Sequence, residues 1–415
     1  MSGFANSSRQ AKEAQSRMLT KSHFHSSRRE FLRTTTGACT SLLLGATGWN
    51  AIANAQAVDP RVAKILAKTI SIDMHNHVYP PETEPHPQRG PQGGGPQGGG
   101  PQGGATPPEQ QQGPELSIAD ELKQSGLTAV CASFVLDFAR NEKPGDARTN
   151  FLHWLDAIDA QLDKGRIRRA LTVTDLQAAH DHARPTIVQS VEGSHFIEGH
   201  LDRVSEVYKR GLRHLQLLHE RDDMVTPLGD TNTGQAHLGG LTPFGADVVK
   251  ECNRLGIVVD MAHASHETVL ATLKIATQPF VVSHTNLDTW TGSNPKMAEM
   301  MKPRLISKEH AKVIADAGGI VGVWAHLTDT LKEFVESIKA MADAIGIDHV
   351  GIGSDTDLLS SRVGSGTNRA WPNFTGAFFP AVAGEMLAQG FSSDDIVKIG
   401  GGNYCRVFGK VTSSH

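Results

Sequence analysis

The sequence predicts a single α/β domain folded as a (β/α)8 barrel of the TIM type. Short apolar segments rich in β-branched residues alternate with amphipathic segments over roughly 300 residues, which predicts a parallel sheet. Eight or nine such apolar segments suit a closed barrel, although an open doubly wound sheet would give similar spacing. No G-x-G-x-x-G motif follows a predicted strand, as a dinucleotide-binding fold would require.

Each predicted strand is a short run of buried-type residues. The strands are expected at residues 69–74, 127–134, 187–191, 212–218, 257–261, 280–282, 320–324 and 350–353, with a weaker candidate at 167–173. Helices are expected at 62–68, 243–255, 307–317 and 332–344. Thr242 followed by Pro243 marks the start of one of them, because threonine caps helices and proline favours the first helical position.

Composition and charge narrow the class of protein. Of the 415 residues, 39% are hydrophobic and 20% charged, as in globular proteins. Residues 1–55 carry seven Lys/Arg and two acidic residues, so the rest of the chain has a net charge of −9. The net negative charge of residues 56–415 argues against a nucleic-acid partner.

The spacing of the four cysteines excludes two kinds of site. They form no C-x-x-C pair, so neither a thiolate zinc site nor a dithiol redox motif is predicted.

The N-terminal segment resembles a twin-arginine export signal. Residues 27–33 read SRREFLR, an apolar stretch follows at 38–53, and residues 53–55 form an Ala-x-Ala cleavage pattern. We therefore expect a signal peptide at 1–55 and a mature domain at 56–415. After export, the mature protein is expected in a bacterial periplasm or outside the cell. A basic amphipathic helix is the alternative. The apolar stretch is short for a transmembrane helix, so no stable membrane insertion of the mature chain is expected.

A low-complexity insertion interrupts the predicted barrel after its first strand. Residues 80–114 are rich in Gly, Pro and Gln and repeat the pentapeptide PQGGG. Such a segment has little to bury, so we expect a disordered loop within the single domain. We favour the interpretation that residues 80–114 are an insertion without function over the alternative that they form a lid that controls access of substrate.

Metal-ligand side chains recur where predicted strands end. They are His75, His77, Glu192, His219, His263, His284 and Asp355. The carboxyl ends of parallel barrel strands meet on one face, so these residues are expected to converge. A single histidine or carboxylate after a strand more often has a structural role than a metal-binding one. The prediction of a metal site therefore depends on the joint arrangement of all seven residues.

The ligand types favour a two-metal site. In the His75-x-His77 motif both imidazoles project to the same side of a strand. Imidazole nitrogen and carboxylate oxygen suit zinc, and five such ligands exceed what one catalytic ion needs. Glu192 could bridge two ions, because a carboxylate has two oxygens. Two zinc ions could then hold a shared hydroxide and polarise a carbonyl, which leaves Asp355 to move a proton to the leaving amine.

The same motifs resemble the membrane dipeptidase (renal dipeptidase) family from residue 70 to about residue 410. They are DMHNH at 73–77, SVEG at 190–193, GLTPFG at 240–245, NRLG at 253–256, VDMAHAS at 259–265, SHTN at 283–286, RLIS at 304–307, VGIGSD at 350–355 and GGN at 401–403. Any one of these motifs could occur by chance, but their combination is specific to this family.

The resemblance implies a role for each residue. His75, His77 and Glu192 would hold one zinc ion, and Glu192, His263 and His284 the other. His219 would bind the scissile carbonyl oxygen, Arg304 would pair with the substrate's C-terminal carboxylate, and Asp355 would be the proton shuttle. The family cleaves dipeptides, often with a D-residue on the C-terminal side, and its members are often dimers, so a homodimer is compatible with the resemblance.

Departures from the family pattern keep other functions open. The family usually has Asp where this chain has His77 and Asn where it has Leu305, and residues 220–223 after His219 also differ. The leading alternative is another binuclear metal amidohydrolase on the same barrel, such as a lactonase, deacylase or peptide-tailoring enzyme. A non-catalytic binding protein is a third hypothesis, which the retained Asp355 disfavours.

Overall fold

The computed structural model describes residues 59–80, 117–137, 143–220, 225–360, 363–374 and 376–413. The expected signal peptide at 1–55 lies outside the described residues. So does the insertion expected at 80–114, apart from Pro80. None of the helices in the described ranges combines the length and the apolar character that a membrane-spanning segment needs.

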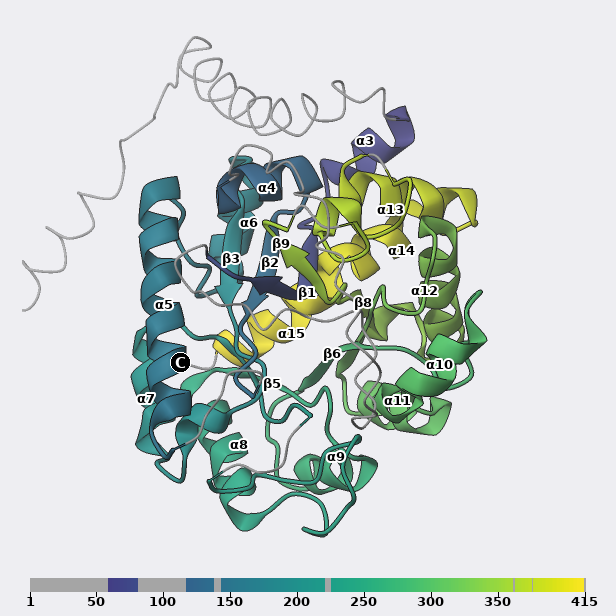
Figure 1. The fold of residues 1–415 in the computed structure, drawn as a ribbon. Helices are drawn as coiled ribbons and strands as arrows, with labels where there is room; N and C mark the ends of the chain where they lie inside the picture. Colours follow the sequence, from purple (N-terminus) through teal and green to yellow (C-terminus); the bar gives the residue numbers. More distant parts are fainter. Residues whose placement is uncertain are drawn as a thin grey trace, which may run out of the picture. The chain divides into compact units, whose positions relative to one another are not determined.

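Eight parallel strands form a nearly closed barrel, as the sequence predicted (Figure 1). The strands are β1 (Ile72–Val78), β2 (Ala129–Ser133), β3 (Thr186–Gln189), β4 (His214–Gln216), β5 (Val258–Asp260), β6 (Val281–Thr285), β7 (Ile320–Val323) and β8 (Val350–Ile352). They pair in the order β3-β2-β1-β8-β7-β6-β5-β4. The remaining seam between β3 and β4 is joined by a parallel bridge from Gln189 to Leu212. A short additional strand, β9 (Thr356–Leu358), pairs with β1.

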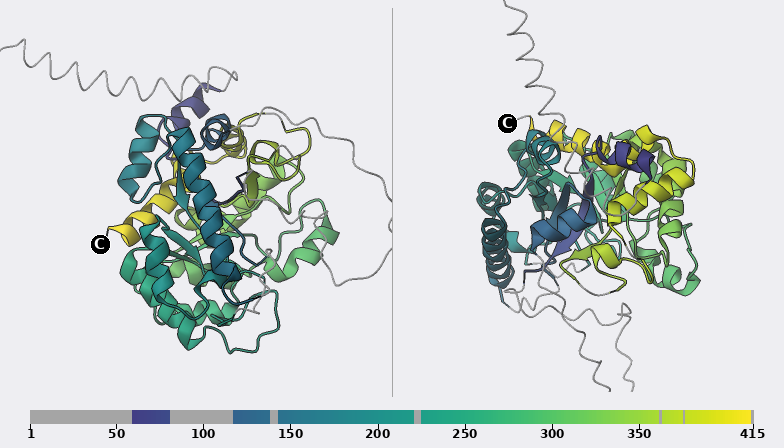
Figure 2. Two further views of the ribbon diagram at one scale, coloured as in Figure 1. Left: turned by 60° about the vertical axis from the view of Figure 1, so that its left-hand side comes forward. Right: turned by 90° about the horizontal axis from the view of Figure 1, so that it is seen from above.

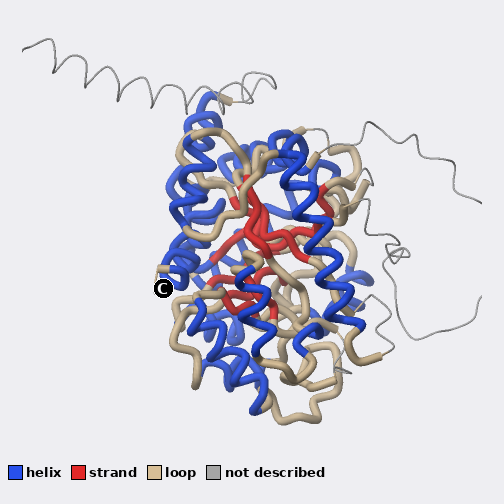
Figure 3. The backbone as a smooth tube through the Cα atoms, turned by 90° about the vertical axis from the view of Figure 1, so that its left-hand side faces the viewer, coloured by secondary structure: helices blue, strands red, loops and turns tan. Residues whose placement is uncertain are grey.

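Helices surround the strands on the outside of the barrel (Figures 2 and 3). The α-helices are α3 (Pro60–Leu66), α4 (Ile118–Ser125), α5 (Asp146–Gly165), α6 (Val173–Asp181), α7 (Asp202–Lys209), α8 (Pro243–Leu255), α9 (His266–Leu273), α10 (Pro295–Met301), α11 (Lys308–Asp316), α12 (Leu331–Ile345), α13 (Phe378–Ala388), α14 (Ser393–Val397) and α15 (Asn403–Thr412). Helix α8 has the predicted bounds because Thr242 caps its first turn and Gly256, at φ 75°, ends it.

The weaker strand predicted at 167–173 is wrong. This segment makes a single parallel bridge, between Arg169 and Ile187, and then turns into α6. Thr172 and Asp175 form a capping box in which each side chain accepts a hydrogen bond from the other residue's backbone N–H. This cap starts helix α6 at Val173, so the segment forms no further backbone hydrogen bonds with β3.

One end of the barrel is filled by the C-terminal helix α15. Its residues Tyr404 and Phe408 are buried and cluster with Ile72, Val258 and Ile320, which lie at or near the starts of their strands. This apolar plug closes the amino end of the barrel, so the opposite, carboxyl end is the one that presents side chains for chemistry.

Candidate metal centre

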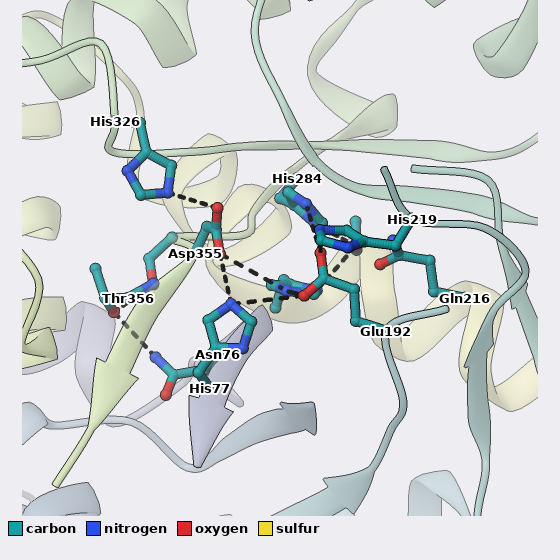
Figure 4. A network of polar contacts seen from close by, with 12 residues as sticks. Asn76, His77, Glu192, Gln216, His219, His284, His326, Asp355 and Thr356 are labelled. Carbon is teal, nitrogen blue, oxygen red and sulfur yellow. Dashed lines mark hydrogen bonds and ion pairs between the residues drawn. The ribbon is translucent and has the colours of Figure 1, made fainter. Parts of the chain in front are cut away.

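Side chains from all eight strand ends form one chain of contacts, and Figure 4 shows the part of it around Glu192 and Asp355. The sequence predicted seven of them, at six strand ends, and the structure brings all seven together. The full set is His75 and His77 (β1), Asp137 (after β2), Glu192 (after β3), His219 (after β4), His263 (after β5), His284 (β6), His326 (after β7) and Asp355 (after β8).

Glu192 lies at the centre of this group and its two carboxylate oxygens face different histidines. Oε2 lies 3.4 Å from Nε2 of His75 and 3.6 Å from Nε2 of His77. Oε1 lies 3.4 Å from Nε2 of His263 and 3.5 Å from Nε2 of His284. The carboxylate thus divides the four histidines into two pairs, as a bridging ligand between two ions would.

The spacing of these atoms fits zinc. Two ligands of a tetrahedral zinc with bonds of about 2.0 Å lie about 3.3 Å apart, close to the separations around Glu192. Nε2 of His75 and Oε2 of Glu192 are buried and have no hydrogen-bond partner, as expected of atoms that bind a cation. Among the described residues, three sets have ligand atoms within 4.8 Å of one another: His75/His77/Glu192, Glu192/His219/His263 and His75/His284/Asp355.

The protonation states of Glu192 and His284 also suit metal binding. Burial by itself would raise the pKa of Glu192, but the neighbouring His219 and His75 hold it well below its usual range, so the carboxylate is ionised. Burial, helped by the nearby His75, holds the pKa of His284 well below its usual range. A neutral imidazole and an ionised carboxylate are the forms that bind zinc.

A serine hydroxyl orients a histidine from each pair. Oγ of Ser283 lies 2.9 Å from Nδ1 of His284 and 3.3 Å from Nδ1 of His75. Both rings therefore keep Nε2 directed toward Glu192, the arrangement that outer hydrogen bonds impose on metal-binding histidines.

Two buried aspartates, Asp73 and Asp260, fix the backbone that carries the site. Oδ1 of Asp73 accepts from the backbone N–H of His75 and of Ser354, the residue before Asp355. Oδ1 of Asp260 accepts from the N–H of Ala262 and of Ser283, the residue before His284. Each aspartate thus ties the end of its own strand to the neighbouring strand end.

Asp355 is held from both sides at the edge of the metal cluster. Oδ1 lies 2.8 Å from Nε2 of His77, and Oδ2 lies 2.5 Å from Nε2 of His326. Burial would raise the pKa of Asp355, but His326 and His77 bring it well below its usual range. Asp355 also has a φ of 55°, as His263 has 65°, a left-handed conformation that is uncommon for non-glycine residues and is found more often than average at functional sites.

His219 connects Glu192 to the carboxylate of Asp137, in the segment after β2. Its Nε2 lies 3.2 Å from Oε1 of Glu192, and its Nδ1 lies 2.5 Å from Oδ1 of Asp137. Burial lowers the pKa of His219, but Asp137 and Glu192 outweigh it and raise the pKa above its usual value. Asp137 thereby directs Nε2 of this ring, a hydrogen-bond donor when protonated, into the site.

Arg304, the predicted substrate-binding residue, lies beside His219 but is paired within the chain. Its guanidinium forms an ion pair with Glu220, the residue after His219. The hydroxyl of Thr285, next to His284, donates a hydrogen bond of 2.8 Å to the backbone oxygen of Arg304. Both side chains of the ion pair are partly exposed, so the pair lies at the rim of the site.

Sequence reasoning missed Asp137 and His326. Asp137 lies four residues beyond the end of β2, and His326 lies three residues beyond β7. Both follow a predicted strand. His326 lies as far beyond its strand as Glu192 and His219 lie beyond theirs, so the same signal could have found it, whereas Asp137 lies one residue further and needs a wider window.

Comparison with known proteins adds a family match. The family model of membrane dipeptidase (peptidase family M19) matches residues 61–415. A curated dipeptidase of Claviceps purpurea, tcpJ, is 26% identical over 259 residues, which are 60% of this chain and 57% of that protein. The chain thus spans less than two thirds of the length of this relative.

Solved structures share the fold. An amidohydrolase from Pseudomonas aeruginosa superposes with a TM-score of 0.64 at 20% identity, covering 85% of this chain and 99% of the other. A metallopeptidase from Rhodobacter sphaeroides, solved with a phosphinate mimic of L-Ala-D-Ala, has a TM-score of 0.56 at 19% identity, covering 70% and 89%. At these identities the superpositions support the barrel fold alone.

Proposed function

The chain belongs to the membrane dipeptidase family of metallopeptidases, and we propose that it is a zinc-dependent dipeptidase that hydrolyses the amide bond of dipeptides. The observation that carries the proposal is the division of four histidines between the two oxygens of Glu192. Two zinc ions bound there would activate a water molecule and polarise the scissile carbonyl.

The protein's own residues supply the remaining steps. His219, whose pKa is raised, donates a hydrogen bond from Nε2 to the carbonyl oxygen as negative charge develops on it. The ionised Asp355 takes the proton of the attacking water and passes it to the leaving amine. Both residues contact the metal-binding group: His219 contacts Glu192, and Asp355 contacts His77.

Substrates with a D-residue on the C-terminal side belong to the proposal as well. The Rhodobacter sphaeroides structure holds a mimic of L-Ala-D-Ala, and the barrel fold is shared. The role that the family resemblance gives Arg304, holding the substrate's carboxylate, stays a prediction, because Glu220 pairs with that guanidinium in this chain.

A second binuclear amidohydrolase activity, on a lactone or an acylated peptide, remains the alternative. Two observations favour it over a strict dipeptidase: His77 in place of the family's usual aspartate, and the Glu220–Arg304 pair at the rim. The first changes a residue of the metal-binding group itself, and the second changes what surrounds that group.

The deciding experiment is a substrate panel, applied to protein purified without chelator. Zinc-loaded protein is assayed with L,L and L,D dipeptides, then after removal of metal and after zinc is restored. We expect cleavage that disappears with the metal and returns with zinc. Zinc-loaded protein that cleaves no dipeptide but opens a lactone or removes an acyl group would replace the proposal by its alternative.

We also propose that residues 1–55 direct export through the twin-arginine route to the periplasm or beyond. The support is the order of paired arginines, apolar stretch and Ala-x-Ala pattern. In a bacterial host, Arg28→Lys with Arg29→Lys should leave the full-length precursor in the cytoplasm. Unchanged processing and fractionation of this double variant would contradict the proposal.

A further inference from the structure

The rim of the metal centre carries an ion pair between Glu220 and Arg304. Glu220 directly follows His219 in the chain, so the ion pair places the guanidinium of Arg304 next to the segment that carries His219. The side chains of Arg304 and Glu220 keep 30% and 27% of their exposure, whereas those of His219 and Glu192 keep 5% and 2%. The pair is therefore accessible to a solute that approaches the buried group.

The charge of this pair determines which end of a peptide it would meet. An isolated arginine would repel the ammonium end of a dipeptide and attract its carboxylate end, which lies on the leaving-amine side. With Glu220 attached, the guanidinium offers no net charge at that place. A substrate carboxylate must then displace Glu220 or lie against a like charge, and like charges at a binding site are unfavourable.

We propose that Glu220 determines specificity by neutralising Arg304, so that the site favours peptides whose C-terminal end is uncharged, such as a carboxamide or an ester, over peptides with a free carboxylate. This inference rests on the proposed peptide-hydrolase function and names its substrate class. A partly exposed ion pair contributes little to folding stability. Glu220 can therefore be changed with little effect on the fold.

The test compares two substrates that share one scissile bond, Ala-Ala and its C-terminal carboxamide, Ala-Ala-NH2. Kinetic constants are measured for the zinc-loaded wild type, Glu220→Gln and Glu251→Gln. Glu251 forms an ion pair with Arg254 on α8, so its variant is matched in charge and in type of contact. Melting temperatures of the three proteins verify that they are folded, and Glu220→Ala serves as a second variant.

The wild type should cleave the carboxamide at least as well as the free acid. Glu220→Gln should raise kcat/KM for the free acid about tenfold, mainly through a lower KM, and change the carboxamide less than about twofold. Glu251→Gln should keep the wild-type ratio. A wild type that prefers the free acid, with a ratio unchanged in both Glu220 variants, would overturn the inference and leave the hydrolase function standing. Failure of zinc-loaded wild type to cleave either substrate would overturn the proposed function itself.

Discussion

Nε2 of His326 lies 2.5 Å from Oδ2 of Asp355. This contact fixes the side of the carboxylate that His77 does not reach, so His326 positions the proposed proton shuttle. His326→Phe should lower kcat about tenfold or more and leave KM and zinc content nearly unchanged, because it removes orientation rather than binding. His349→Phe is the control, since His349 contacts the backbone of Gly319 outside the site. Equal losses in both variants would assign His326 a merely structural role.

Asp355→Asn tests the shuttle directly. The amide keeps the size of the side chain but cannot accept a proton from water, so kcat should fall by a factor of about 10² to 10⁴. Metal content and melting temperature should stay close to those of the wild type. Turnover near the wild-type level in a zinc-loaded variant would remove Asp355 from the mechanism.

Asp260 should make folding stability depend on pH at the acid end. Burial opposes ionisation, but the hydrogen bond and charge of His214, together with the charge of His284, lower the pKa of Asp260 to about 2, compared with about 3.9 in an unfolded chain. Because the folded pKa is the lower one, its stabilisation is complete above about pH 4 and is lost as the pH falls toward 2. The loss amounts to roughly 2–3 kcal/mol.

Denaturant unfolding between pH 5 and pH 2 measures this effect. Asp260→Asn should be less stable than the wild type at pH 5 and should lose less stability on acidification. Asp247→Asn, on the exposed face of α8, should follow the wild-type curve. Parallel curves for the wild type and Asp260→Asn would exclude Asp260 as a source of acid sensitivity.

Gly322 holds β7 against β6 without room for a side chain. A Cβ there would lie 1.8 Å from the backbone oxygen of Ser283, the residue before His284. Gly322→Ala should therefore destabilise the fold by about 3 kcal/mol and reduce zinc binding, because it displaces the end of β6. Gly384→Ala, whose Cβ would have only a 3.7 Å contact with Val62, should be neutral or mildly stabilising. A Gly322→Ala melting temperature within two degrees of the wild type would contradict this packing.

The sequence predicted the barrel and most of the centre because one periodic signal serves both. Apolar strands end where polar ligands begin, and parallel strands bring those ends together. Asp137 was missed because it lies four residues beyond β2, further than the other ligand-type residues lie from their strands, whereas His326 has the same offset from β7 as Glu192 has from β3 and was simply not identified. The Glu220–Arg304 pair was missed for another reason: the contact joins the segment after β4 to a 3-10 turn whose last residue, Arg304, lies 19 residues beyond β6, and no local sequence pattern relates the two. The strand predicted at 167–173 failed because a capping box overrides apolar content.

Metal stoichiometry tests the central claim, that Glu192 bridges two zinc ions. Zinc is counted by mass spectrometry in wild type purified without chelator and in Glu192→Ala, whose melting temperature verifies folding. We predict about two zinc ions per chain in the wild type and a loss at both sites in the variant, because the two carboxylate oxygens serve one ion each. One ion or none in the wild type, or an unchanged count in folded Glu192→Ala, would contradict the account.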